Sequence, residues 1–128
     1  MSPNNLYVYH HGNDCLAIEK SLMEWMRKDF GDDSTIRVIN QRPRSLEPDD
    51  EGFLPDWDLG INVDKNHLNE ERFLRIISFF IGYAARLKVE FVVGSYNEET
   101  GFSEDITFIE SRSKLRKVVR KAAPFFVL

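Results

Sequence analysis

Hydrophobic residues along this chain alternate between the two-residue period of strands and the three- to four-residue period of helices. Short alternating runs predict strands at residues 6–9, 35–39 and 57–63, and the last of these, WDLGINV, has the strictest alternation. Two more β-prone runs, at residues 89–96 and 102–109, are joined by the short segment NEETG and predict a hairpin with glycine near the end of its turn.

Helical spacing appears in three segments. Apolar residues recur every three or four positions over residues 15–30 and 70–87, and the wide apolar stripe of the second segment predicts the central core helix. Either Asn66 or Asn69 is placed to cap this second helix. A third helix, over about 112–123, carries basic residues above a narrow apolar stripe.

The order of elements predicts the fold class. Between the second and third strands, residues 41–56 contain three prolines and a glycine, which predicts a long surface loop. The predicted order is therefore β-α-β-β-α-β-β-α in a single α+β domain spanning residues 1–128. We expect a two-layer sandwich with a mixed or antiparallel sheet and helices on one face, in a split β-α-β arrangement with an added hairpin.

Composition supports a folded domain in a reducing compartment. The chain has 128 residues, 42% of them hydrophobic and 30% charged, which is typical of one globular domain. The single cysteine, Cys15, has no internal disulfide partner. No secretory signal and no membrane-spanning run are visible in the sequence, so a cytoplasmic location is expected and a membrane partner is not.

Charge is distributed unevenly along the chain. Six bases and no acid occur between residues 112 and 121, whereas the rest of the chain has 11 of the 17 bases and all 21 acids. This asymmetry indicates either that the basic segment pairs with the acidic remainder of the chain or that the protein has two surfaces of opposite charge. Because the rest of the chain is acidic, we expect the basic helix to lie against its own domain, and nucleic acid is an unlikely partner. A small nucleic-acid-binding or regulatory domain that uses this helix is the alternative.

Few residues suggest catalysis. A Cys/His pair or a metal site can be drawn from His10, His11 and Cys15, but the favoured interpretation is that both histidines end a strand at a solvated turn while Cys15 packs in the core. The carboxylates of residues 47–58 lie mostly in the proline-rich loop, which cannot readily preorganise them. We therefore expect no enzyme activity, cofactor or metal, with a His/carboxylate enzyme as an alternative.

Acidic residues gather in the loop and in the hairpin, next to aromatic residues expected to be exposed. Carboxylates that face a basic partner protein increase the rate of association, and buried aromatic side chains then stabilise the complex. Trp57 and Phe102 are among the aromatic residues expected to be exposed, whereas Val93, Ile106 and Phe108 are expected to pack in the core. An ordinary solubilising surface is the alternative. The predicted partner-binding residues are Asp49, Asp50, Glu51, Phe53, Asp56, Tyr96, Glu98, Glu99, Glu104 and Asp105.

Residues 58–109, with an LGINV strand, a core helix and a VVGSYNEETGFSEDI hairpin, resemble the small α+β immunity proteins encoded beside bacterial polymorphic or contact-dependent toxins. The resemblance implies a cytoplasmic, non-catalytic protein that neutralises a cognate toxin domain by covering its active site or an adjacent surface. If that toxin is a nuclease, its cleft is cationic and the carboxylates can take the place of phosphates. A homodimer through the hairpin edge or the FFVL tail is a further alternative.

Overall fold

The computed structural model describes residues 4–31 and 36–126 of the chain. It has the α+β composition and the order of elements that the sequence predicts. The elements are β1 (Asn5–Gly12), α1 (Cys15–Phe30), β2 (Ile36–Asn40), β3 (Trp57–Val63), the short 3-10 helix η1 (Lys65–His67), α2 (Glu70–Leu87), β4 (Phe91–Tyr96), β5 (Ser103–Ile109), α3 (Leu115–Ala122) and the 3-10 helix η2 (Ala123–Phe126).

The five strands form one sheet in the order β2-β3-β1-β4-β5, and every neighbouring pair is antiparallel. The sheet is therefore antiparallel rather than mixed. Strand β3 lies between β1 and β2, and β1 lies between β3 and β4, so each helix-containing connection skips one strand. This is the split β-α-β connectivity of ferredoxin-like sheets, extended at one edge by β5.

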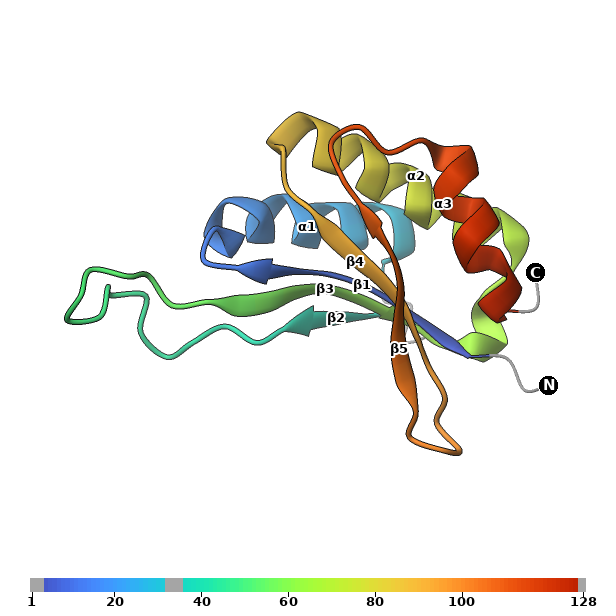
Figure 1. Cartoon of the computed structure of the whole chain (residues 1–128), viewed down its shortest axis with the longest axis horizontal. Helices are drawn as coiled ribbons and strands as arrows, with labels where there is room; N and C mark the ends of the chain where they lie inside the picture. Colours follow the sequence, from blue (N-terminus) through green and yellow to red (C-terminus); the bar gives the residue numbers. More distant parts are fainter. Residues whose placement is uncertain (1–3, 32–35, 127–128) are drawn as a thin grey trace.

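One face of the sheet packs against the helices. Alternate residues of the central strands, such as Leu6, Val8 and Ile61, are fully buried, and so are Phe73 and Phe80 of α2. Figure 1 shows α1 and α2 lying side by side along the same side of the sheet, with α3 beside α2. Burial of these large apolar side chains is the main contribution to stability.

The caps of the helices follow local chemistry. The Asn69 side chain accepts a hydrogen bond from the backbone N–H of Arg72 at 2.8 Å, so Asn69 rather than Asn66 caps α2. Helix α1 ends at Gly31, whose φ of 56° lies in the region that favours glycine. Helix α3 begins at Leu115, three residues later than predicted, and Pro124 lies in the following 3-10 turn.

The two acidic segments lie at opposite ends of the sheet. Residue Gly12 pairs with Trp57 at the base of the 41–56 loop, whereas Asn5 pairs with Tyr96 at the base of the β4–β5 hairpin. The eight residues of β1 separate these positions by about 23 Å at a rise of about 3.3 Å per residue. Figure 1 shows the loop and the hairpin projecting in different directions from the sheet.

Three expectations about aromatic and histidine positions are wrong. Trp57 is only 4% exposed, because it occupies the core-facing phase of β3. Phe108 is 48% exposed, because Thr107 and Ile109 take the buried positions beyond an irregularity in pairing at Val93 and Gly94. His10 does not end a strand at a solvated turn; it is buried within β1, which continues to Gly12.

Two expectations fall at the limits of the described chain. The second strand is predicted to begin at Thr35, which lies outside the described residues, and β2 runs from Ile36 to Asn40. The FFVL segment is predicted to pack rather than to extend into solvent. Its residue Phe126 is 3% exposed and its ring lies 5.7 Å from that of Phe73, whereas residues 127–128 lie outside the described chain.

Candidate protein-binding surface

The sheet face opposite the helices carries tyrosine and carboxylate side chains. Register places Tyr7 and Tyr9 of β1 on this face, between Asn62 and Gly60 of β3 on one side and Gly94 and Val92 of β4 on the other. These residues help form a shallow depression of about 360 Å³. Its lining residues are Tyr7, Tyr9, Ile39, Gln41, Asp58, Asn62, Tyr96, Ser103 and Asp105.

Glycines in the neighbouring strands make room for the tyrosine rings. A Cβ built on Gly94 would lie 2.0 Å from Cζ of Tyr7, and one built on Gly60 would lie 2.7 Å from Cβ of Tyr9. The two rings are 5.7 Å apart, and the Tyr7 hydroxyl donates a hydrogen bond of 2.8 Å to Asp105. The rings are therefore held close against the backbone of the sheet, with their orientation fixed partly by a carboxylate.

Burial and nearby carboxylates keep these phenols protonated. Partial desolvation raises the pKa of Tyr7, and the hydrogen bond and negative charge of Asp105 raise it further. The pKa of Tyr9 is also raised, by desolvation and then by the charges of Asp105 and Asp58. Both hydroxyls are thus hydrogen-bond donors throughout the physiological pH range.

A histidine lies at the loop end of this face. The Nδ1 atom of His11 is 2.5 Å from Oδ1 of Asp58, and its Nε2 atom is 3.9 Å from Oδ2 of Asp56. The hydrogen bond to Asp58 raises the pKa of the exposed His11 ring. The predicted residue Asp56 therefore lies next to the sheet face rather than at the distant tip of its loop.

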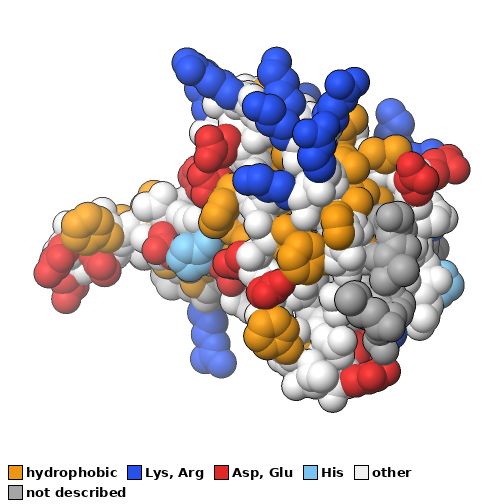
Figure 2. All heavy atoms as spheres, turned by 45° about the vertical axis from the view of Figure 1, so that its right-hand side comes forward, with side chains coloured by type: hydrophobic (Ala, Val, Ile, Leu, Met, Phe, Trp, Pro, Cys, Tyr) orange, Lys and Arg blue, Asp and Glu red, His pale blue; other side chains and the backbone are white. Residues whose placement is uncertain are grey.

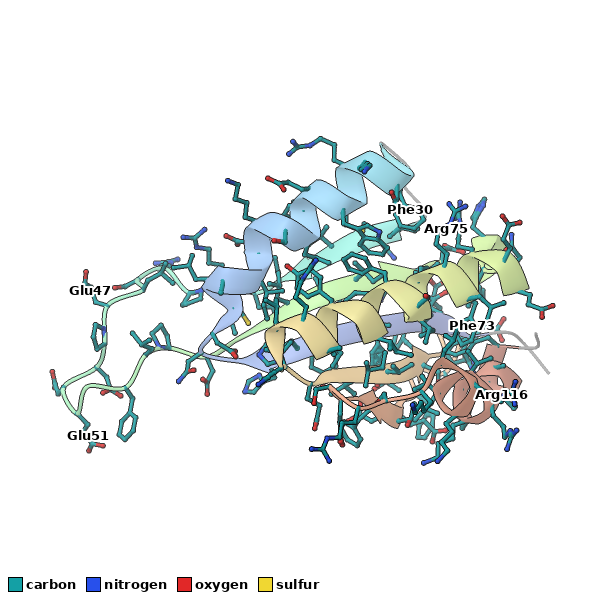
Figure 3. The ribbon with its side chains drawn as sticks, turned by 90° about the horizontal axis from the view of Figure 1, so that it is seen from above. Phe30, Glu47, Glu51, Phe73, Arg75 and Arg116 are labelled. Atoms are coloured by element: carbon teal, nitrogen blue, oxygen red, sulfur yellow. The ribbon has the colours of Figure 1, made fainter. Side chains whose placement is uncertain are left out.

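The other loop residues differ in role. Asp49 folds the tip of the loop, because its Oδ1 atom accepts from the backbone N–H groups of Glu51 and Phe53 at 2.9 Å each. The Asp50 and Glu51 side chains are exposed, and Phe53 is 62% exposed. Figure 3 shows Glu47 and Glu51 on the projecting loop, far from the labelled residues of α2 and α3. The loop tip therefore presents an apolar ring surrounded by carboxylates.

The hairpin residues are likewise divided between folding and surface. Glu98 accepts a 2.7 Å hydrogen bond from the buried side chain of Asn5, so it helps to fix the hairpin to β1. Glu99 is exposed in the turn, and Glu104 is half-buried opposite Ser95. Asp105 accepts the hydrogen bond that the Tyr7 hydroxyl donates. Tyr96 is 37% exposed and lines the depression on the open face.

Sequence reasoning missed Tyr7, Tyr9 and His11 as surface residues of this site, and it included Asp58 in the acidic segment 47–58 without selecting it as a contact residue. The signal was present in the segment LYVYHH, where strict alternation puts both tyrosines and His11 on the face opposite Leu6 and Val8. Which face of a strand remains uncovered depends on where the helices pack, and alternation alone does not contain that information.

A small apolar hollow adjoins the base of the acidic loop. It has a volume of about 110 Å³ and is lined by Asn13, Leu16, Leu46, Leu54, Pro55 and Trp57. Leu16 is 58% exposed and Leu54 is 48% exposed. The hollow is too small for a drug-sized ligand, and its size suits a single apolar side chain.

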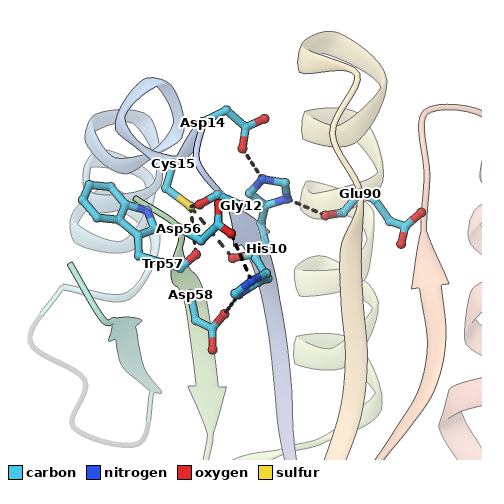
Figure 4. A network of polar contacts seen from close by, with 9 residues as sticks. His10, Gly12, Asp14, Cys15, Asp56, Trp57, Asp58 and Glu90 are labelled. Atoms are coloured by element: carbon cyan, nitrogen blue, oxygen red, sulfur yellow. Dashed lines mark hydrogen bonds and ion pairs between the residues drawn. The ribbon is translucent and has the colours of Figure 1, made fainter. Parts of the chain in front are cut away.

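The His10 network is organised for structure rather than for nucleophilic catalysis (Figure 4). His10 contacts the backbone oxygen of Glu90 through Nδ1 at 2.8 Å and the carboxylate of Asp14 through Nε2, so it joins β1 to α1 and to the segment before β4. The Cys15 thiol donates to the carbonyl of Trp57 at 3.3 Å, and burial raises its pKa to about 12. A thiol in this state is a poor nucleophile.

The same cluster offers the closest grouping of metal-ligating atoms in the described residues. One ligand atom each from His10, Asp14 and Cys15 lies within 4.8 Å of the others. Metal binding would require the Cys15 thiolate, which its raised pKa disfavours, and it would compete with the bond between His10 and Asp14. The cluster fits an internal hydrogen-bond network better than a metal site.

Comparison with known proteins gives no assignment. No family model, curated protein or solved structure matches the chain. Among the helices in residues 4–31 and 36–126, none has the length and apolar character needed to cross a bilayer. Function must therefore be inferred from the side chains that the fold places on its surfaces.

Proposed function

We propose that this protein is a non-catalytic binding protein that neutralises a cognate bacterial toxin domain by covering its active site or an adjacent surface. One observation carries the proposal: an open, tyrosine-lined sheet face has a projecting acidic segment at each end. Each of these segments also presents a phenylalanine that is 62% exposed, Phe53 in the loop and Phe102 in the hairpin.

The chemistry of this surface suits a protein partner with a basic surface. Tyrosines provide contact area at low entropic cost because they have few rotatable bonds, and those of β1 are held in place against glycines. Carboxylates such as Asp50, Glu51 and Glu99 are exposed and attract cations before contact is made. A shallow face supports large-area contact better than it encloses a small substrate.

We also infer that the domain is a two-layer sandwich, with helices packed on one face and the partner-binding face left open. The burial pattern of β1 supports this inference, since Leu6 and Val8 are fully buried whereas Tyr7 and Tyr9 are only half-buried. A toxin docked on the open face would become the missing layer. This arrangement would let an antiparallel sheet bind a partner without rearranging its core.

The acidic rim favours a toxin whose active site binds a polyanion. In a nuclease the cleft is cationic, and Asp50, Glu51 or Glu99 would occupy positions that phosphates take in the substrate. The reducing cytoplasm, where such a toxin must be neutralised, is compatible with the single reduced Cys15.

Co-purification with the product of the adjacent gene tests the proposal. Charge reversal by Asp50→Lys, Glu51→Lys or Glu99→Lys should slow association and weaken its salt dependence. Tyr9→Ala should speed dissociation because it removes a contact ring. The matched control is Glu24→Lys on the exposed surface of α1, which makes the same change in net charge away from the sheet face.

The proposal fails if the loop, hairpin and Tyr9 variants bind the co-purified protein with the kinetics of the parent. It also fails if the protein alone forms a stable dimer that buries Tyr9, because the open face would then be a homodimer interface. Sedimentation of the isolated protein and of its Tyr9→Ala variant separates these two outcomes.

A further inference from the structure

The basic segment near the C-terminus is not neutralised by the acidic body. The six bases are Arg112, Lys114, Arg116, Lys117, Arg120 and Lys121. All six are exposed, and none of them forms an ion pair with a carboxylate of the described residues. Figure 2 shows Lys and Arg side chains gathered at one end of the molecule, where α3 lies. The expected match between this helix and its own domain is not observed.

Three lysines lie along one side of α3, Lys114 at its N-cap and Lys117 and Lys121 within the helix. Lys114, Lys117 and Lys121 follow helical spacing and line an open groove of about 400 Å³ between α3 and β5. At a rise of about 1.5 Å per residue they form a ridge about 10 Å long. Val118 and Ala122 are buried below them, so the helix that carries the ridge is held against the domain.

The same groove contains an exposed aromatic ring. Phe108 of β5 lines it and is 48% exposed, although its neighbours Thr107 and Ile109 are buried. The irregular pairing near Gly94 leaves Phe108 on the outer side of β5, where hydrophobic burial does not explain it. The groove therefore combines one flat aromatic face with a ridge of ammonium groups.

We propose that this groove binds single-stranded nucleic acid, with backbone phosphates on Lys114, Lys117 and Lys121 and a base stacked on Phe108. A positive groove that follows the backbone, together with an aromatic ring that stacks a base, is the combination that sequence-independent single-strand binding requires. The three lysines follow one another along this ridge of about 10 Å, so each can contact a phosphate of a strand that runs along it.

The acidic remainder of the chain does not cancel the positive electrostatic potential of the groove. Interactions between exposed charges are largely screened beyond about 8 Å at physiological ionic strength, so the charges that line the groove dominate there. Four bases line it, the three ridge lysines and Arg112, against the single carboxylate of Glu110. Phe108 pairs with Val92 at the edge of the open sheet face, whereas the three lysines lie outside that face, the loop and the hairpin. The lysine variants therefore test this inference without altering the proposed toxin-binding residues.

Fluorescence anisotropy with a labelled short oligothymidylate tests the inference on the full chain. We expect binding whose affinity falls about thirtyfold between about 50 and 200 mM salt, as three to four phosphate contacts predict. The triple variant Lys114→Glu, Lys117→Glu, Lys121→Glu should abolish binding. Phe108→Ala should weaken it about tenfold by removing the stacking surface.

The control variants make the same kinds of substitution elsewhere on the surface. The triple variant Lys20→Glu, Arg27→Glu, Lys28→Glu changes net charge equally on the exposed side of α1, and Phe53→Ala removes an even more exposed ring from the loop. Both should bind the oligonucleotide like the parent. Thermal melts confirm that each variant is folded, and single lysine reversals replace the triple variant if it is not.

Several outcomes would overturn the inference. One is the absence of binding at low salt. Another is equal competition by polyglutamate with no effect of Phe108→Ala, which would indicate a site for an acidic protein segment. A third is binding to vesicles that contain anionic lipid without binding to the oligonucleotide, which would indicate a membrane surface.

Discussion

The ring of Tyr7 occupies the space that a side chain at Gly94 would need. A Cβ at that position would lie 2.0 Å from Cζ and 2.2 Å from the hydroxyl oxygen of Tyr7. The same hydroxyl donates to Asp105, so Tyr7 links β1 to both strands of the β4–β5 hairpin. The open face is thus a set of mutually dependent positions rather than a collection of independent surface residues.

Substitution of Gly94 by alanine should therefore disturb the open face. We expect Gly94→Ala to destabilise the fold by about 1–3 kcal/mol, as overpacking does, or to expel the Tyr7 ring. Urea unfolding measures the change. Gly82→Ala in α2 is the matched control, because its Cβ would meet no atom within 4 Å and alanine favours the helix by about 1 kcal/mol. A double variant with Tyr7→Ala should recover much of the loss; no recovery would contradict the steric explanation.

The ionisation of Tyr7 should depend on Asp105. The pKa of Tyr7 is raised above its ordinary 10.0 by desolvation and by Asp105, so Asp105→Asn should lower it in a phenolate absorbance titration. Folding favours the protonated phenol. The resulting stabilisation is fully present below about pH 10 and is lost as the pH rises through the folded-state pKa. Unchanged titration in Asp105→Asn, with Asp50→Asn as the control, would show that Asp105 has no influence.

Substitutions at Asn5 and Glu98 should show which of the two side chains is needed for folding and whether the charge of Glu98 is needed only for binding. The Asn5 side chain, 1% exposed, donates to Glu98 and accepts from the backbone N–H of Lys65 at 2.7 Å each. Asn5→Ala should cost about 1–3 kcal/mol of unfolding free energy, because it leaves buried groups unpaired. Glu98→Gln keeps an acceptor for Asn5 and should leave stability nearly unchanged while removing the charge. A large loss of stability in Glu98→Gln would mean that the charge itself is required for folding.

Periodicity predicts most of the fold because it reports local geometry. The predicted bounds of α1 and α2 match the structure, and the strands begin and end within two residues of their predicted bounds, except that β1 continues three residues further, to Gly12. The antiparallel strand order was not predictable, since β1 pairs with β3 and β4, which lie far along the chain. The position of Phe108 also depends on a pairing irregularity that alternation does not reveal.

The candidate surface is only partly predictable for a related reason. Exposure of Phe53, Glu99 and Asp50 follows from the composition of their loops, and the structure agrees. The sequence does not show that Glu98 is bonded to Asn5 or that Tyr7 is bonded to Asp105, because these partners are separated by 93 and 98 residues. Only the sheet register brings them together.

The reactivity of Cys15 should distinguish a structural thiol from a nucleophile. The thiol is 1% exposed, donates to the Trp57 carbonyl and has a pKa raised to about 12 by burial. Native protein at neutral pH should therefore react with iodoacetamide far more slowly than the same chain unfolded in urea, where the thiol is accessible and its pKa returns to about 8.5. Cys15→Ser, which reacts with neither form, is the control for other nucleophiles. An activated Cys/His pair would give the opposite order, with the native thiol reacting faster, and that result would restore the enzyme alternative.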